Sequence, residues 1–401
     1  MSYDLRHISF STAKKGCASG SNIVCTEDGG KTWKERLSAR PLKINDFFIE
    51  LHGVSFVAQS DGWTVGEAGQ IMKTEDGGIT WKIAVQNTGC GQNAFFINNK
   101  IGWIHGYSSP YICKTIDGGQ TLQKQDMGIN VSSVFFVSET TGWAAGTKQE
   151  ISDRVSKSWS VIQETIDGGK TWKTQFNEFL GNKKVVASLY NVFFLNAQVG
   201  WVVGKKGIIL HTEDGGEHWA HQISNDPILQ LTNVHFVDSK TGWITGIKST
   251  DSWAGVVLHT TDSGNHWEIQ NVKQGVGLEE TFFTDDKNGW VTGETEWGEE
   301  SLLYHTTDGG KTWKETVLGH IGKIYPVLKA TMVFLLQIKH GWRRQKTGEE
   351  PGGIPERFYL NIHGILLICS RETNKYPLVQ KARNRFVHLA SHFLEVNRFQ
   401  R

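Results

Sequence analysis

One eight-residue motif recurs along this chain and limits its possible folds more than any other feature. The first copy runs from Thr26 to Trp33 and reads Thr-Glu-Asp-Gly-Gly-Lys-Thr-Trp; six edited copies follow at spacings of 41 to 50 residues. Repeats with a period in the forties form stacked or circular arrays in which each repeat is one supersecondary unit. The seven copies are marked by their aspartates, Asp28, Asp76, Asp117, Asp167, Asp214, Asp262 and Asp308.

A second pattern, Gly-Trp-x-x-Gly, lies at a fixed place in each repeat. Its tryptophans are Trp63, Trp103, Trp143, Trp201, Trp243 and Trp290, and a phenylalanine stands seven residues before each of them. The first repeat follows the same pattern with Phe10, but has Gly16-Cys17 in place of Gly-Trp. Each repeat reads as four short antiparallel strands with the aspartate motif between strands three and four. The sequence therefore predicts an all-β fold, a seven-bladed β-propeller over residues 1–322.

The residues of the strands predict their order within a blade. First strands such as 133–137 (Ser-Val-Phe-Phe-Val) are nearly continuous apolar runs, whereas third strands such as 207–212 (Gly-Ile-Ile-Leu-His-Thr) alternate. Continuous apolar runs suit strands buried on both faces, and alternation suits half-exposed strands. The first strand of each repeat is therefore expected to be the innermost.

The aspartate motif has the chemistry of a turn. Its carboxylate can accept backbone N–H groups, its glycine pair allows positive φ, its threonine hydroxyl adds a local hydrogen bond, and its tryptophan is expected to plug the neighbouring blade. One carboxylate per turn falls far short of the six to eight oxygens of a calcium site. The seven aspartates are therefore interpreted as structural, and no metal or cofactor is expected.

These two motifs carry a resemblance to a known family. The aspartate motif resembles the Asp-box, or bacterial neuraminidase repeat. Combined with the Phe and Gly-Trp-x-x-Gly pattern, it resembles the photosystem II assembly and stability factors, a family of seven-bladed propellers. The match covers roughly residues 5–318. The resemblance implies a non-catalytic role in assembly, but Asp-boxes also occur in sialidases, xyloglucanase-type hydrolases and sortilin-type receptors, so it indicates fold more than function.

The repeat pattern breaks down after Trp313. Residues 333–342 resemble the beginning of an eighth repeat, which lacks its later glycine and its aspartate motif. Residues 319–401 contain no aspartate and carry a net charge of +9, against −8 for residues 1–318. Residues 323–401 are therefore interpreted as an incomplete repeat and an aperiodic basic tail. The tail is either a basic partner-binding segment or, as we favour, the result of a coding sequence that leaves its ancestral frame near Trp342.

The cysteines and the N-terminal residues bear on the compartment. The five cysteines stand at unrelated spacings without a Cys-x-x-Cys pair, so buried free thiols are expected. No signal region is seen at the start, and no apolar run approaches the length of a membrane span. The sequence as written is expected in the cytoplasm, or in the periplasm or thylakoid lumen if an N-terminal segment is missing.

Tests for catalytic chemistry give little support to an enzyme. A sialidase grips a carboxylate with several arginines, but between Arg40 and Arg343 this chain has only Arg154. A glycoside hydrolase needs two carboxylates about 5–10 Å apart, and no spacing singles out a pair. Three histidines that share one third-strand position are expected to be exposed strand residues too far apart to bind one metal: His211, His259 and His305.

The most informative variation lies in the loops between strands two and three, which leave the face opposite the Asp-boxes. From the second-strand glycine to the motif aspartate the separation is 21, 16 and 15 residues in repeats four, six and seven, against 8 to 11 elsewhere. Only three tryptophans before Trp342 lie outside the repeat positions, and each falls in one of these long loops: Trp159, Trp253 and Trp297. Aromatic residues on variable loops favour binding. The alternative is that each folds back onto its own loop or blade edge.

The sequence therefore predicts a scaffold or assembly factor that binds a protein partner through this face. The predicted ligand-binding residues are Trp159, Trp253, Trp297, Arg154 and Glu294. The resemblance implies a photosystem II subunit, or another intermediate of a membrane complex, as the partner. A monomer that binds no nucleic acid and has no membrane span is expected. The alternative is a carbohydrate-active propeller, either a xyloglucanase-type hydrolase or a glycan-binding module, in which the same tryptophans stack on sugar rings.

Overall fold

The computed structural model describes most of residues 5–320, with short gaps, and two strands further on. The gaps lie at 21, 39–42, 45–46, 49–50, 67–68, 87, 107–108, 153–154, 180–187, 224–228, 250–252 and 296–299, and the later strands at 358–362 and 365–369. The chain divides into two compact units, Met1–Gly322 and Lys323–Arg401. None of the described segments is a helix long and apolar enough to span a membrane.

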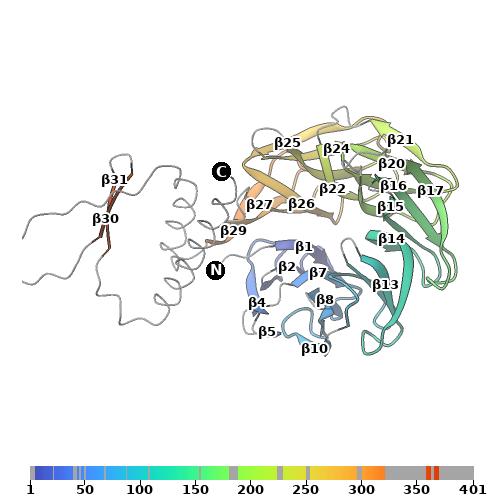
Figure 1. Ribbon diagram of the computed structural model, residues 1–401, viewed down its shortest axis with the longest axis horizontal. Coiled ribbons are helices and arrows are strands. Elements are labelled where there is room, and N and C mark those ends of the chain that lie inside the picture. The colour runs from blue at the N-terminus through green and yellow to red at the C-terminus, as the bar shows by residue number, and fades with distance from the viewer. Residues whose placement is uncertain are drawn as a thin grey trace, which may run out of the picture. The chain divides into compact units, whose positions relative to one another are not determined.

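The first unit contains seven blades of four antiparallel strands, which confirms the predicted propeller (Figure 1). Blade 1 is β1 (Leu5–Phe10), β2 (Gly16–Gly20), β3 (Asn22–Thr26) and β4 (Lys34–Ser38). Blade 2 is β7 (Leu51–Phe56), β8 (Gly62–Gly66), β9 (Ile71–Thr74) and β10 (Lys82–Val85). Blade 3 is β11 (Asn93–Phe96), β12 (Gly102–His105), β13 (Ser109–Thr115) and the first part of β14 (Gln123–Phe136). Blade 4 is the rest of β14, β15 (Gly142–Ser152), β16 (Val155–Thr165) and β17 (Lys173–Phe179).

Blade 5 is β18 (Leu189–Phe194), β19 (Gly200–Gly204), β20 (Ile208–Thr212) and β21 (Ala220–Ile223). Blade 6 is β22 (Leu229–Phe236), β23 (Gly242–Ser249), β24 (Trp253–Thr260) and β25 (Glu268–Gln274). Blade 7 is β26 (Val276–Phe283), β27 (Gly289–Thr295), β28 (Glu300–Thr306) and β29 (Lys314–His320). Two small hairpins complete the described elements: β5 (Lys43–Ile44) with β6 (Phe47–Phe48), and β30 (Phe358–Ile362) with β31 (Ile365–Cys369).

Blades 3 and 4 share one strand and so form a single seven-stranded sheet. Residues 123–126 of β14 pair with β13, and residues 130–136 pair with β15. In every other pair of consecutive blades, the last strand of one blade and the first strand of the next are separate strands.

The first strand of each blade lies innermost, as predicted, and these strands form a closed ring. Each contacts the first strand of the next blade, and β26 of the last blade contacts β1 of the first. At this closure the backbone N–H of Leu5 donates to Ser301 Oγ at 3.0 Å. Each blade takes all of its strands from one stretch of the chain, so non-covalent packing closes the ring.

The Asp-boxes are hydrogen-bonded turns, as predicted. In the first, Asp28 accepts the backbone N–H of Thr32 at 2.9 Å and its hydroxyl at 2.6 Å, while Gly30 N–H donates to Thr26 Oγ1 at 2.8 Å. Both glycines have positive φ, 74° and 83°. The hydrogen bonds from Thr32 lower the pKa of Asp28 to about 2. The backbone N–H contact to the carboxylate recurs in the other six turns, and in the fifth and sixth turns Nδ1 of His218 and His266 takes the place of the threonine hydroxyl.

The tryptophan that plugs the neighbouring blade is that of strand two, so the prediction for the Asp-box tryptophan was wrong. Trp143 stacks on Phe194 of the next blade with ring centroids 3.5 Å apart, and its indole N–H donates to the carbonyl of Gly215 in the next Asp-box at 3.0 Å. The Asp-box tryptophan packs edge-on against its own blade, as Trp219 does on Phe194 at 5.9 Å. The reason is geometric: strand two is inside the sheet, and the motif is at its edge.

Two further expectations are corrected by the register of strands two and three. Residues that stand opposite each other on these strands are in contact. The third-strand histidines therefore stack on the strand-two tryptophans and are not exposed as predicted; the rings of His211 and Trp201, for example, are 4.7 Å apart. The expected free thiols are disulfides: Cys17 is bonded to Cys25, directly opposite it, and Cys90 to Cys113. The side chain of Cys369 lies outside the described residues.

Candidate functional site

A cavity of about 360 Å³ lies among the beginnings of the inner strands, at the end of the ring away from the Asp-boxes. The inner strands run toward the turns between strands one and two, which share a face with the Asp-boxes, so their first residues lie toward the opposite face. This is the face predicted to bind a partner. The cavity is lined by Arg6, His7, Asn93, Ser132, Ser133, Tyr190, Asn191, Gln230, Thr232, Asn233, Ile247, Glu279, Glu280 and Glu294.

A belt of polar side chains encircles the cavity and joins successive blades. The belt residue stands three positions before the pattern phenylalanine of its inner strand, and in blades 4 to 7 it accepts a backbone N–H from the next blade. The acceptors and donors are Ser133 with Val192 at 3.3 Å, Asn191 with Val234 at 3.2 Å, Asn233 with Thr281 at 3.3 Å, and Glu280 with Ile8 at 2.5 Å. The belt thus fixes the spacing of blades 4 to 7 and blade 1 around the cavity.

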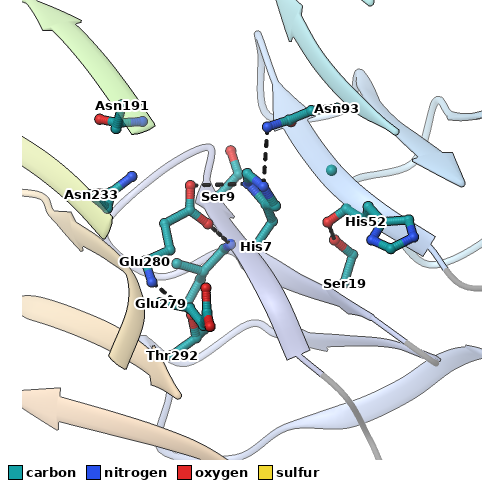
Figure 2. A network of polar contacts seen from close by, with 12 residues as sticks. His7, Ser9, Ser19, His52, Asn93, Asn191, Asn233, Glu279, Glu280 and Thr292 are labelled. Atoms are coloured by element: carbon teal, nitrogen blue, oxygen red, sulfur yellow. Dashed lines mark hydrogen bonds and ion pairs between the residues drawn. The ribbon is translucent and has the colours of Figure 1, made fainter. Parts of the chain in front are cut away.

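His7 completes the belt where the ring closes (Figure 2). Its Nδ1 lies 3.1 Å from Glu280 Oε1, and its Nε2 lies 3.2 Å from Asn93 Nδ2. Burial alone would lower the pKa of His7, but the carboxylates of Glu280 and Glu279 outweigh it, and the pKa is raised above its ordinary value. His7 can reach Asn93 because the belt residue between them is Gly53, where a Cβ would come within 2.6 Å of Asn93 Oδ1.

An arc of aromatic rings lies one step nearer the Asp-box end of the inner strands. Its members stand directly before the pattern phenylalanines of blades 3 to 7: Phe95, Phe135, Phe193, His235 and Phe282. Consecutive rings are 5.1 to 5.2 Å apart. His235 Nε2 donates to the carbonyl of Phe283 at 2.9 Å, and burial lowers its pKa to about 4, so it stays neutral at pH 7. The arc forms an apolar layer next to the polar belt, on the side of the Asp-boxes.

The charges of the cavity are unevenly placed. Three carboxylates, those of Glu279, Glu280 and Glu294, come from blade 7, and the two basic groups, Arg6 and His7, come from blade 1. The wall formed by blades 4 to 6 is uncharged. Among the described residues, no group of three histidine, cysteine or acidic side chains could hold a metal ion. The arrangement can offer hydrogen bonds and ion pairs to a ligand.

The structure places one of the predicted binding residues in this cavity. Glu294, at the end of β27, lines it. Trp159 was predicted to lie in a loop, but it lies in strand β16 of blade 4, because strands two and three of that blade continue through most of the long insertion. It is half-buried, with its ring 5.4 Å from Phe179 of its own blade. Trp253 begins β24 of blade 6 and packs over Gly277 of blade 7. Blade 5 separates these two tryptophans, and neither lines the cavity. Arg154 and Trp297 lie outside the described residues.

Sequence reasoning missed most of the cavity. The signal that could have found it is a polar residue three positions before the phenylalanine in otherwise apolar inner strands. Six of the seven blades have one there: His7, Asn93, Ser133, Asn191, Asn233 and Glu280.

Comparisons with known proteins agree with this architecture. A family model described as photosynthesis system II assembly factor YCF48 matches four overlapping segments, residues 1–92, 42–131, 130–230 and 222–322, which together span all seven blades. Curated relatives are the chloroplastic photosystem II stability/assembly factor HCF136 of Arabidopsis thaliana, 28% identical over 96 residues, and that of Oryza sativa subsp. japonica, 29% identical over 96 residues. These matches cover 23% of this chain and 21% and 20% of the relatives, so the chain spans about a fifth of their length.

Two solved structures share the fold at low sequence identity. The first, YCF48 bound to D1 peptide, is 21% identical with a TM-score of 0.54, over 76% of this chain and 92% of the other. The second, YCF48 from Cyanidioschyzon merolae, is 18% identical with a TM-score of 0.55, over 75% of this chain and 95% of the other. At these identities the likeness shows a common propeller architecture.

Proposed function

This chain belongs to the photosynthesis system II assembly factor family, and from that membership we propose that it holds a segment of a photosystem II subunit at its central cavity without catalysing a reaction. One solved relative carries a D1 peptide. By analogy, the partner segment of this protein is a peptide of a photosystem II subunit or of another membrane-complex intermediate.

The observation that carries this proposal is the polar cavity on the face opposite the Asp-boxes. It combines a volume of about 360 Å³ with hydrogen-bonding side chains from blades that the belt holds in place. A preorganised polar hollow can bind a peptide without losing much conformational entropy of its own. Because carboxylates gather on blade 7, the proposal includes ion pairing there, and binding should weaken as salt is added.

A non-catalytic role is supported by what Glu280 already does. One of its carboxylate oxygens accepts the backbone N–H of Ile8 and the other contacts His7, so this carboxylate holds the ring closed. A glycoside hydrolase would need a carboxylate pair available to a substrate. We propose that the protein is a monomer and that Trp159, Trp253, Trp297 and Arg154 contact the partner, Trp159 and Trp253 doing so outside the cavity.

The experiment is peptide binding by the full chain, measured by calorimetry with soluble segments of photosystem II subunits. Glu294→Gln removes one carboxylate of the cavity wall. Because this removes an ion-pairing group, the Kd of the bound segment should rise by about 3- to 10-fold. Glu213→Gln is the matched control, because Glu213 lies in an Asp-box turn on the opposite face and should leave the Kd unchanged.

Two outcomes would overturn the proposal. One is a bound segment whose Kd responds to Glu213→Gln and not to Glu294→Gln. The other is turnover of a polysaccharide that Glu279→Gln abolishes, which would establish a carbohydrate-active propeller. A Trp159→Ala/Trp253→Ala double variant that binds like the parent would remove the two tryptophans from the interface and leave the cavity proposal standing.

A further inference from the structure

Six of the seven interfaces between blades share a stacked tryptophan, and three of these six also share a glutamine hydrogen bond. The strand-two tryptophan of blades 2 to 7 stacks on the pattern phenylalanine of the following blade, with ring centroids 3.4 to 4.0 Å apart. Nearer the outer edge, a fourth-strand glutamine donates to a carbonyl of the next Asp-box in blades 3, 4 and 5. These contacts are Gln125 with Lys170 at 3.1 Å, Gln175 with Gly215 at 3.1 Å, and Gln222 with Ser263 at 2.8 Å.

The interface between blades 1 and 2 lacks both contacts and has a disulfide instead. Cys17 occupies the tryptophan position, and Cys25 stands directly opposite it on strand three. A Cβ on Gly78, in the Asp-box of blade 2, would lie 2.5 Å from Cys17 Sγ. At the interface between blades 7 and 1, a Cβ on the equivalent Gly30 would lie 2.4 Å from the indole nitrogen of Trp290. The disulfide therefore fills the space that tryptophan fills elsewhere.

The second disulfide lies on the other side of blade 2. Cys113 belongs to β13 of blade 3, and its partner Cys90 lies in the segment that leads from blade 2 to blade 3. Both are packed in one apolar cluster with Trp63 and Ile71 of blade 2. All four cysteines of the two disulfides are at most 3% exposed.

The same two interfaces lack the glutamine contact. Arg36 in blade 1 and Ala84 in blade 2 stand at the fourth-strand position that glutamine occupies in blades 3 to 6. The outer strands of blade 2, β9 and β10, are also short, with four residues each. Among the outer strands of the first five blades, only β21 is as short. The two disulfides thus lie on either side of blade 2, at one interface that lacks both contacts and at one that lacks the glutamine contact.

We propose that these disulfides make the packing of blades 1 to 3, the cysteine sector, depend on redox state. The interfaces within this sector are tightly packed when Cys17–Cys25 and Cys90–Cys113 are oxidised, and they loosen when the disulfides are reduced. Blades 4 to 7 stay packed in both states. Two thiols have much less volume than an indole, so reduction leaves the interface between blades 1 and 2 underpacked. It also releases the connecting segment from β13. Blades 4, 5 and 6 have no cysteine and keep their tryptophan contacts in either state.

The chemistry is thiol–disulfide exchange with a disulfide-donating oxidant, such as a disulfide oxidoreductase or glutathione disulfide. A thiolate of one cysteine attacks the donor disulfide, forming a mixed disulfide and releasing one donor thiol. The second cysteine of the pair then displaces the other donor thiol and closes the bond. Each pair loses two protons and two electrons to the donor. Because the sulfurs are buried in the closed sector, exchange must occur before it closes or when it opens locally.

The test is hydrogen exchange of the full chain, resolved by peptide, with and without a phosphine reductant. We expect amides of β1, β7 and β11 to exchange at least about tenfold faster after reduction, and those of β18 and β22 to keep their rates. Thiol titration of the denatured, unreduced chain should find one thiol, and reduction should release four more. Equal acceleration in every blade, no acceleration, or five thiols before reduction would overturn the proposal.

A pair of variants separates the two disulfides. Cys17→Trp with Cys25→Lys gives blade 1 the pair that blade 2 has at Trp63 and Lys73, so the β1 amides should become insensitive to reductant while those of β11 still respond. Cys369→Ser is the matched control, and it should keep the full response. A redox response of β1 that persists in the double variant would contradict the assignment. If that variant does not fold, the comparison of oxidised and reduced parent protein still decides the question.

Discussion

The Nδ1 atom of His7 lies 3.1 Å from Oε1 of Glu280, and this contact joins the first blade to the last across 273 residues of sequence. The same carboxylate accepts the backbone N–H of Ile8. One side chain of blade 7 therefore holds both the backbone and the first belt residue of blade 1. This relationship leads to a prediction about pH.

The contact between His7 and Glu280 should give stability that is lost as the pH rises. The folded pKa of His7 is raised, so the stabilisation is complete below the unfolded value near 6.5 and disappears as the pH passes through the folded pKa. Glu280→Gln should lower the free energy of unfolding by about 1–3 kcal/mol at pH 6 and by less at pH 9. Urea unfolding at both pH values measures this, and an equal loss at both would contradict a role for the charged histidine.

His235 should have the opposite pH dependence. Its folded pKa is about 4, below the unfolded value, so the unfolded chain binds the extra proton and stability falls as the pH drops below about 6.5. The loss should approach about 1.4 kcal/mol per pH unit until the pH nears 4. His235→Phe inserts the residue found at this position in blades 3, 4, 5 and 7, and should remove this part of the pH dependence. The free energy of unfolding is measured in urea between pH 6.5 and 4.5. If it changes with pH as steeply in the variant as in the parent protein, His235 is not the cause of this pH dependence.

The two tryptophans of one blade should differ in their contribution to stability. Trp201 stacks on Phe236 of the next blade at 3.5 Å and is fully buried, so Trp201→Ala should cost about 3–5 kcal/mol. Trp219 is partly exposed and packs edge-on against Phe194 of its own blade, so Trp219→Ala should cost roughly half as much. Denaturant midpoints of the two variants give the comparison, which fails if the costs are equal or reversed.

One Asp-box turn should be improved by a glycine. Ser263 occupies the position of the first motif glycine and has a φ of 65°, a conformation that costs a residue with a Cβ roughly 1 kcal/mol. Ser263→Gly should raise the free energy of unfolding by about 0.5–1 kcal/mol, and Ser263→Ala, which keeps the Cβ, should not. Thermal unfolding of the pair decides, since a gain from alanine as large as that from glycine would exclude backbone conformation as the cause.

The blades and turns could be predicted because their determinants are local and repeated seven times. Cys17 in the tryptophan position and Cys25 in the third-strand position could also have been paired, since these positions face each other in every blade. Cys90 could not, because it lies in a connection with no equivalent. Glu294 was found because the insertion after the second-strand glycine of repeat seven is long, although the residue itself lies in β27. His7 and Glu280 were missed because only closure of the ring brings them together, and each alone resembles an ordinary polar residue in a strand.

The shared strand β14 limits where this ring can be opened. Blades 7 and 1 meet at a non-covalent interface, since no blade combines strands from both ends of the propeller. A circularly permuted propeller, with blade 7 linked to blade 1 and new ends cut between two other blades, should therefore be able to form the same seven blades. New ends placed between blades 3 and 4 would instead divide a continuous strand. Among the described blades, blades 3 and 4 are the one neighbouring pair joined by a continuous strand, so they cannot be separated without cutting that strand.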